Sequence, residues 1–224
     1  MSNPRTALGI AVAAAATAMA CAGPEKAVVD RYFGALAAGD NQTLTSFSAV
    51  RLDKDVEAWS IVSASEETRA PVTLPDLTAK HEALVAELEE NKKKANEYAL
   101  ERLDDVDRVR ELQKEEKAIP RSLQEVAETW NEFNGKDREL KIKVGDAKDA
   151  METEARITRL SVGTNTEVEK TPGEVLTKKV DLSLTIDGEA RPYEMTLRRY
   201  VLEQPEGASR ATSRWVVYDL KPKA

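Results

Sequence analysis

Residues 180–186 read VDLSLTI, a run in which apolar and polar side chains alternate strictly. Alternation with a period of two is typical of a β-strand that buries one face. The pair Asp187-Gly188 is a turn signal, and the run YEMTL at residues 193–197 alternates again and continues to Leu202. We therefore expect two antiparallel strands joined by a tight turn.

Other segments on either side of this pair also carry strand patterns. The run WVVYDL at residues 215–220 predicts the last strand, which Pro222 ends because proline cannot donate to a β-ladder. We also expect strands at residues 57–63, 140–144 and 154–162. Most of the chain after residue 136 is thus predicted to form an antiparallel sheet.

Two short helices are expected before the first strand. Residues 24–38 repeat apolar side chains at spacings of three and four, which makes one apolar helix face from Val28, Val29, Tyr32, Phe33 and Leu36. Gly39 supplies a stop, and Asp40 can cap a second helix over residues 41–47. Helices followed by antiparallel strands indicate an α+β fold.

The run VVDRYFGALAAGD at residues 28–40, followed by Leu44 and Phe47, resembles the opening of the NTF2-like superfamily, which includes SnoaL and ketosteroid isomerase. The pair Arg214-Trp215 near the C-terminus resembles the final strand of that family. The resemblance implies a conical fold, in which the N-terminal helices lie on a curved antiparallel sheet.

The middle of the chain departs from the family pattern. Residues 79–118 contain no Gly or Pro and are rich in Lys, Arg, Asp and Glu, which predicts one long helix of about 60 Å at 1.5 Å per residue. Pro120 ends that helix, and a second helix over residues 123–133 is expected to stop at Gly135. We interpret residues 77–135 as a helical hairpin inserted between the two parts of the domain.

The predicted organisation thus has five parts. They are a signal peptide at residues 1–20, a tether at 21–24, the N-terminal part of the domain at 25–76, the helical insertion at 77–135 and the C-terminal sheet at 136–224. The apolar seam of the first inserted helix is thin, and two interpretations of its charges stay open. One is a solvated helix face, and the other is a coiled coil that binds a partner protein or a second copy.

The N-terminus predicts export. Residues 1–6 are polar with one positive charge, and residues 7–18 form an uncharged, alanine-rich run that is shorter than the about 20 residues needed to span a bilayer. The sequence Ala18-Met19-Ala20-Cys21 then resembles the lipobox of bacterial lipoproteins, although Ala18 stands where Leu is usual. The resemblance implies cleavage before Cys21 and acylation of its thiol. Plain secretion and an uncleaved cytosolic helix are the alternatives.

The lipobox resemblance also implies a location. The tether from Cys21 to Pro24 would hold the domain roughly 10–15 Å from the lipid. Ala22 replaces the Asp associated with inner-membrane retention, which favours the outer membrane, facing the periplasm. In a host without an outer membrane, the expected place is the outer face of the cell membrane.

Composition excludes several classes of function. A net charge of -7 without a basic cluster argues against binding to nucleic acid, whose phosphates attract Lys and Arg. One Cys and one His cannot build a Cys/His zinc site or a disulfide framework. No motif for a cofactor is present, so we expect neither a metal nor a cofactor, although carboxylate sites for calcium or magnesium stay open.

Candidate catalytic residues come from the resemblance alone. In the ketosteroid isomerase branch a Tyr on the first helix donates a hydrogen bond to the substrate oxyanion, and an Asp after the second helix moves the proton. Tyr32 occupies the matching position, and Asp53 or Asp55 lies near that of the base. Neither Asp precedes the expected Pro, no second acid is identified, and Tyr32 otherwise fits a core aromatic. His81 is expected on an exposed helix face.

Two functional interpretations follow. The first is a non-catalytic, lipid-anchored protein of the cell envelope that binds a partner protein, cell-wall material or an apolar small molecule through the NTF2-like domain and the helical insertion. The alternative is an acid–base enzyme of the isomerase or cyclase type, with a pocket around Tyr32 and Asp55.

The lipobox resemblance makes a direct prediction about the N-terminus. Mass spectrometry of the protein from cells that export it should find Cys21 as the first residue, with its thiol acylated, because the small residues before Cys21 suit cleavage. An unmodified thiol at Cys21 would contradict the lipoprotein interpretation.

Overall fold

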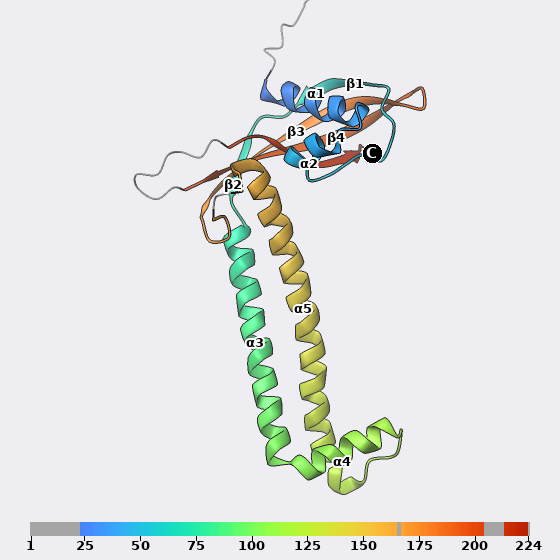
Figure 1. The fold of residues 1–224 in the computed structure, drawn as a ribbon, viewed down its shortest axis with the longest axis vertical. Helices are drawn as coiled ribbons and strands as arrows, with labels where there is room; N and C mark the ends of the chain where they lie inside the picture. The colour runs from blue at the N-terminus through green and yellow to red at the C-terminus, as the bar shows by residue number, and fades with distance from the viewer. Residues whose placement is uncertain (1–22, 165–166, 204–212, 224) are drawn as a thin grey trace, which may run out of the picture.

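A computed structural model describes residues 23–164, 167–203 and 213–223. The predicted signal peptide and Cys21 lie outside these residues. In the described part the protein is α+β and consists of a head, formed by the sheet with two short helices, and a long helical arm (Figure 1). The elements are α1 (Pro24–Ala37), α2 (Asn41–Phe47), β1 (Ala58–Ala64), β2 (Thr68–Pro71), α3 (Leu74–Glu101), α4 (Leu103–Lys114), the 3₁₀ helix η1 (Arg121–Leu123), α5 (Gln124–Val162), β3 (Gly173–Ile186), β4 (Glu189–Leu202) and β5 (Val216–Pro222).

The sheet is antiparallel and has the order β1-β3-β4-β5, with β2 also paired to β3. The predicted tight turn between β3 and β4 is confirmed, since Ile186 pairs with Glu189 across Asp187 and Gly188. Both turn residues have positive φ, 54° and 74°, which fits a two-residue hairpin turn and explains the Asp-Gly pair. The expected strands at residues 57–63 and 215–220 are confirmed as β1 and β5.

Strands β1 and β2 lie end to end along the same edge of β3. Ser65 bridges the gap between them, because its backbone N donates to the Lys179 carbonyl at 2.8 Å and its Oγ accepts from the Lys179 backbone N at 3.0 Å. Pro71 at the end of β2 pairs with Glu174 at the start of β3. The chain therefore leaves the sheet for the arm and returns to the point that it left.

The two faces of the sheet carry different helices. On one face α1 and α2 cover a core that includes Tyr32, Phe33, Phe47, Leu182 and Met195. On the other face the last turns of α5 pack on a second core, which includes Ile157, Val162, Val175, Tyr200 and Val216. The root of the arm and the helix α1 thus lie on opposite faces of the sheet.

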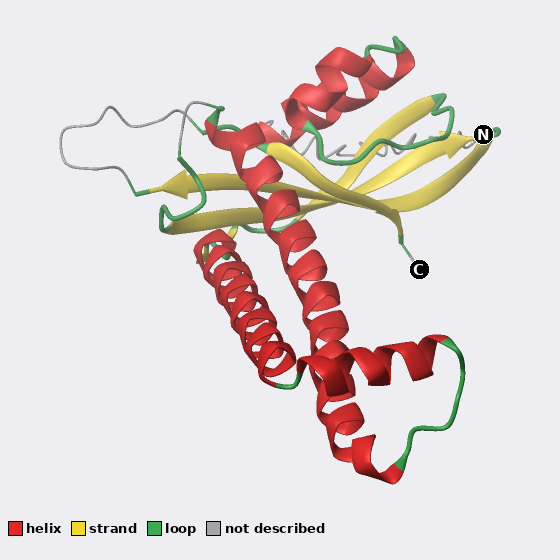
Figure 2. Ribbon diagram, turned by 60° about the horizontal axis from the view of Figure 1, so that its bottom comes forward, coloured by secondary structure: helices red, strands yellow, loops and turns green. Residues whose placement is uncertain are grey.

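The arm is an antiparallel pair of long helices, α3 and α5, with 28 and 39 residues. At 1.5 Å per residue these helices measure about 42 and 58 Å. Asn91 Nδ2 donates to the Phe133 carbonyl at 3.2 Å, and Lys136 pairs with Glu87 at 2.9 Å, which fixes the register of the two helices. At the far end α4 turns away and lies across the beginning of α5 (Figure 2).

Several expectations about the arm are wrong. Residues 140–144 and 154–162 are helical rather than strands, and α5 continues through Gly135 to Val162. Glycine inside a helix costs about 1 kcal/mol relative to alanine. Burial of side chains such as Leu140, Ala147 and Ile157 on one face of α5 outweighs that cost. The helix ends at Gly163, whose φ of 96° suits glycine.

The first arm helix also differs from the expectation. The predicted single helix over residues 79–118 is broken at Arg102, whose φ of -124° and ψ of 37° leave the helical region. The helical segment therefore runs over residues 74–162 rather than 77–135. Strand β2, with only four residues, has no alternation that would have predicted it.

A buried polar cluster joins the root of the arm to the sheet. The Tyr200 hydroxyl donates to Glu154 Oε1 at 2.7 Å, and Arg198 Nη1 lies 3.5 Å from Glu154 Oε2. The Arg198 guanidinium stacks 3.5 Å above the centre of the Tyr218 ring. Burial, with Glu154 as a neighbour, strongly raises the pKa of Tyr200, so this hydroxyl remains a donor.

The cluster predicts a cost for removing one hydroxyl. Tyr200→Phe should lower the free energy of unfolding by about 1–3 kcal/mol, because Glu154 loses a buried donor. Tyr193→Phe is the matched control, since Tyr193 is equally buried but its hydroxyl forms no hydrogen bond with any described residue. Urea unfolding of both variants checks this, and equal losses would contradict a role for the hydrogen bond.

Candidate functional site

Tyr32 is fully buried beneath the loop that follows α2. Its hydroxyl accepts from the Leu52 backbone N at 2.9 Å and donates to the Val50 carbonyl at 3.4 Å. Its ring meets Phe33 edge to face, with ring centres 5.1 Å apart. Burial is the main reason why the pKa of Tyr32 lies above its ordinary value. The hydroxyl therefore holds the loop against α1. Its one hydrogen is already donated to the Val50 carbonyl and is not free to bind a ligand.

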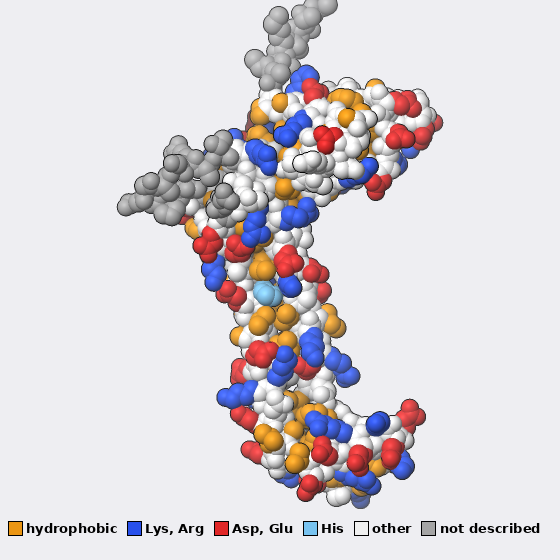
Figure 3. Space-filling view, in the orientation of Figure 1, with side chains coloured by type: hydrophobic (Ala, Val, Ile, Leu, Met, Phe, Trp, Pro, Cys, Tyr) orange, Lys and Arg blue, Asp and Glu red, His pale blue; other side chains and the backbone are white. Residues whose placement is uncertain are grey.

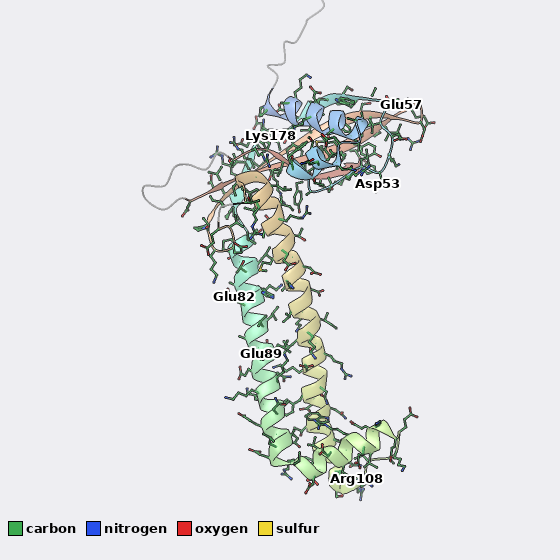
Figure 4. The ribbon with its side chains drawn as sticks, in the orientation of Figure 1. Asp53, Glu57, Glu82, Glu89, Arg108 and Lys178 are labelled. Carbon is green, nitrogen blue, oxygen red and sulfur yellow. The ribbon has the colours of Figure 1, made fainter. Side chains whose placement is uncertain are left out.

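Asp53 and Asp55 lie on that same loop, and both are exposed. Asp53 lies 3.9 Å from Arg51, and Figure 4 places it at the end of the head farther from Lys178. A surface cavity of about 520 Å³ is lined by Leu36, Ala37 and residues 51–56, which include both aspartates. Tyr32 does not line this cavity. Tyr32, on α1, thus contacts the loop that carries Asp55, but the two side chains do not line one cavity.

The space between the helices and the sheet is filled by side chains. Phe33, Leu182, Leu184 and Met195 meet there, each with at most 1% of its surface exposed. His81, which was expected on an exposed helix face, lies half-buried on α3. Within the described ranges no group of three His, Cys, Asp or Glu side chains is placed to hold a metal ion. The head therefore offers a packed scaffold rather than an assembled acid–base site.

The shaft of the arm carries charges that are largely paired along each helix. Lys94 pairs with Glu90 at 2.7 Å, and Lys143 pairs with Glu139 at 2.6 Å. Figure 3 shows Lys and Arg interspersed with Asp and Glu along the whole arm. Exposed pairs of this kind contribute little to stability, because water and salt screen the attraction between the charges. They keep the shaft solvated, with charges of both signs along its length (Figure 3).

The far end of the arm, residues 98–130, is built differently, and we call it the arm tip. Val106 and Val109 of α4 pack against Val126 and Ala127 of α5 in a small core of its own. Arg110 stacks 4.3 Å above the centre of the Trp130 ring. A 12-residue helix is marginal alone, so this packing holds α4 across the arm.

Two leucines at the arm tip remain exposed. Leu100 and Leu103 flank the break at Arg102 and keep 75% and 52% of their surface exposed. They are two of five large hydrophobic residues that are exposed in the described part of the chain, and they are the two that lie close together in sequence. The arm tip is therefore the strongest candidate for a binding surface. The sequence held a weak signal of it, since Asn91 and Arg102 both interrupt the heptad repeat of apolar residues between Leu77 and Leu112, and Arg102 coincides with the break.

Burial of Tyr32 predicts how stability depends on alkaline pH. Its folded-state pKa lies above the ordinary value of about 10, so the stability that it contributes is full below that pH and falls as pH rises toward the folded pKa. Tyr32→Phe should flatten this part of the stability profile, because the buried hydroxyl that titrates is removed. Urea unfolding of the variant and of the unchanged protein between about pH 9 and 11 checks this, and equal slopes in the two proteins would contradict it.

Comparison with protein-family models, curated proteins and solved structures finds no match to this chain. In the described ranges, no helix combines the length and the apolar character that crossing a bilayer requires.

Proposed function

We propose that the protein is a lipid-anchored, non-catalytic interaction protein of the cell envelope, which binds a partner protein through the arm tip. The observation that carries the proposal is the pair of exposed leucines, Leu100 and Leu103, on either side of the helix break at the far end of the arm. Exposed apolar groups held on a packed frame suit a protein interface.

The head is the proposed platform of this arm. Two N-terminal helices on an antiparallel sheet agree with the NTF2-like resemblance, and in that interpretation the arm is an insertion between β2 and β3. The sequence features of the lipobox support an anchor at Cys21, placed at the outer membrane facing the periplasm, or at the outer face of the cell membrane in a host with one membrane. Helix α1 begins on the side of the head away from the arm, so an anchor there would direct the arm tip away from the lipid (Figure 1).

The partner is expected to be a protein. The chain has a net charge of -7, which disfavours nucleic acid, and the two leucines call for an apolar counterpart. The alternative function, an isomerase or cyclase with Tyr32 as donor, receives no support from the geometry, because backbone groups occupy both sides of that hydroxyl.

A matched truncation tests the proposal. Residues 92–132 are replaced by a short Gly/Ser linker between Asn91 and Phe133, which are already hydrogen-bonded across the arm. Both cores of the head remain, so the melting temperature should change by only a few degrees. Loss of the partner with retention of the fold is the expected result.

The leucines are tested separately by photo-crosslinking in cells that produce the protein. A crosslinking side chain at Leu103 should give a discrete adduct that disappears in Leu100→Ser, whereas one at Ile142, which is 65% exposed on the shaft, should give none. An adduct of twice the mass of the chain would identify the partner as a second copy. Equal adducts at the two positions would contradict binding at the arm tip.

A further inference from the structure

A groove opens on the head between the start of α1 and the outer strand β1, and we call it the β1 groove. Its volume is about 570 Å³, and it is lined by Gly23, Glu25, Lys26 and Asp30 together with residues 59–64. The groove is separated from the arm by the sheet, because α1 and the root of the arm lie on opposite faces of the sheet.

The strand side of the groove is apolar. Trp59 stacks on Phe33, with ring centres 5.3 Å apart, and Ile61 packs beside it on the same core. The pairing register shifts between Ile61 and Ser63, so Val62 is the extra residue of a β-bulge and keeps 69% of its surface exposed. Bulges can redirect a side chain out of a sheet, and this one presents an apolar side chain to the solvent.

The charges around the groove compensate one another. Lys178 Nζ lies 3.2 Å from Glu25, and Lys26 forms an ion pair with Asp30. The Trp59 indole N also donates to Asp30, at 3.2 Å. Two bases and two acids leave the rim without net charge, so a surface that approaches it meets little electrostatic attraction or repulsion.

The position of the groove in the chain suggests what covers it. Gly23 is part of its lining, and Cys21 stands two residues earlier in the sequence. If Cys21 carries the lipid anchor, two residues span at most about 7 Å. So short a tether would keep the Gly23 end of the groove close enough for the groove to reach the lipid surface. Strand β1 carries no charge from Ala58 to Ala64, and no described segment pairs with its outer edge.

We infer that the β1 groove seats the head on the membrane, with Val62 and the edge of Trp59 in contact with the boundary between headgroups and acyl chains. Tryptophan and exposed aliphatic side chains favour that boundary. Because the rim is neutral, the contact does not depend on anionic lipid. The inference rests on the proposed anchor and adds an orientation to it, since a seated groove fixes the arm on the side away from the lipid.

The test uses the full, acylated chain in neutral phosphatidylcholine vesicles. Cys21 is the sole cysteine, so acylation leaves a newly introduced cysteine as the one thiol to label. The Val62→Cys variant receives an environment-sensitive fluorophore, and nitroxide lipids serve as quenchers. Leu100→Cys and Ile142→Cys on the arm are the matched exposed controls.

Quenching at position 62 should exceed quenching at positions 100 and 142 at least threefold, in neutral and in anionic vesicles alike. Equally weak quenching at all three positions of a vesicle-bound chain would overturn the groove contact and leave the anchor standing. Self-quenching at position 62 without lipid quenching would also overturn it, in favour of β1 pairing with a second copy. Labelling of two thiols per chain would show that Cys21 is free, which overturns the proposed anchor itself.

A second variant separates contact from mere proximity. Val62→Asp in a chain labelled through Ala64→Cys should reduce lipid quenching severalfold, because a charge cannot enter the acyl boundary without cost. The same label with Ala70→Asp, on an exposed residue of β2 that does not line the groove, controls for an added negative charge at the same edge of β3. Unchanged quenching in Val62→Asp would overturn the role of Val62.

Discussion

The structure depends on the pairing of β2 with the start of β3, which closes the base of the arm. Pro71 pairs with Glu174, and the Val72 backbone N donates to the Gly173 carbonyl at 3.0 Å, so the strands before and after the arm meet at its base. A chain that leaves and re-enters a sheet at one point must travel out and back over equal distances. This constraint sets the antiparallel register of α3 and α5, and Thr78 strengthens it by donating to the Glu169 carbonyl at 3.1 Å.

This closed pairing at the base of the arm also separates the parts of the fold that local sequence could predict from those that depend on contacts between distant segments. The β3–β4 turn and the cap of α2 are local, since Asp187-Gly188 adopts positive φ and Asp40 Oδ1 accepts from the Thr43 backbone N at 2.9 Å. The length of α5 is not local. Gly135 is a helix stop by its own properties, and it becomes helical because α5 must return along α3 to the sheet.

The candidate sites also combine features that local sequence indicated with features that depend on tertiary contacts. The spacing of Tyr32 in the sequence agreed with a catalytic donor, but its role depends on where residues 50 and 52 bring their backbone groups. No local pattern gives that position. The break at Arg102 could be noticed in the sequence as an interruption of the seam, whereas the crossing of α4 over α5 depends on the contacts of Val106 and Val109 with Val126. Sequence patterns thus located the arm, and packing defined the arm tip.

The uninterrupted α5 makes the arm a molecular ruler. Its 39 residues run from the arm tip to the second core of the head without a hinge, so the distance between them is set by residue count at about 1.5 Å each. One inserted residue would turn everything beyond it by about 100° and separate α5 from the seam with α3. Two turns added to both helices would lengthen the arm by about 10 Å and keep the seam aligned. The reach of this protein can therefore change during evolution in paired, heptad-sized steps, while the head stays as it is.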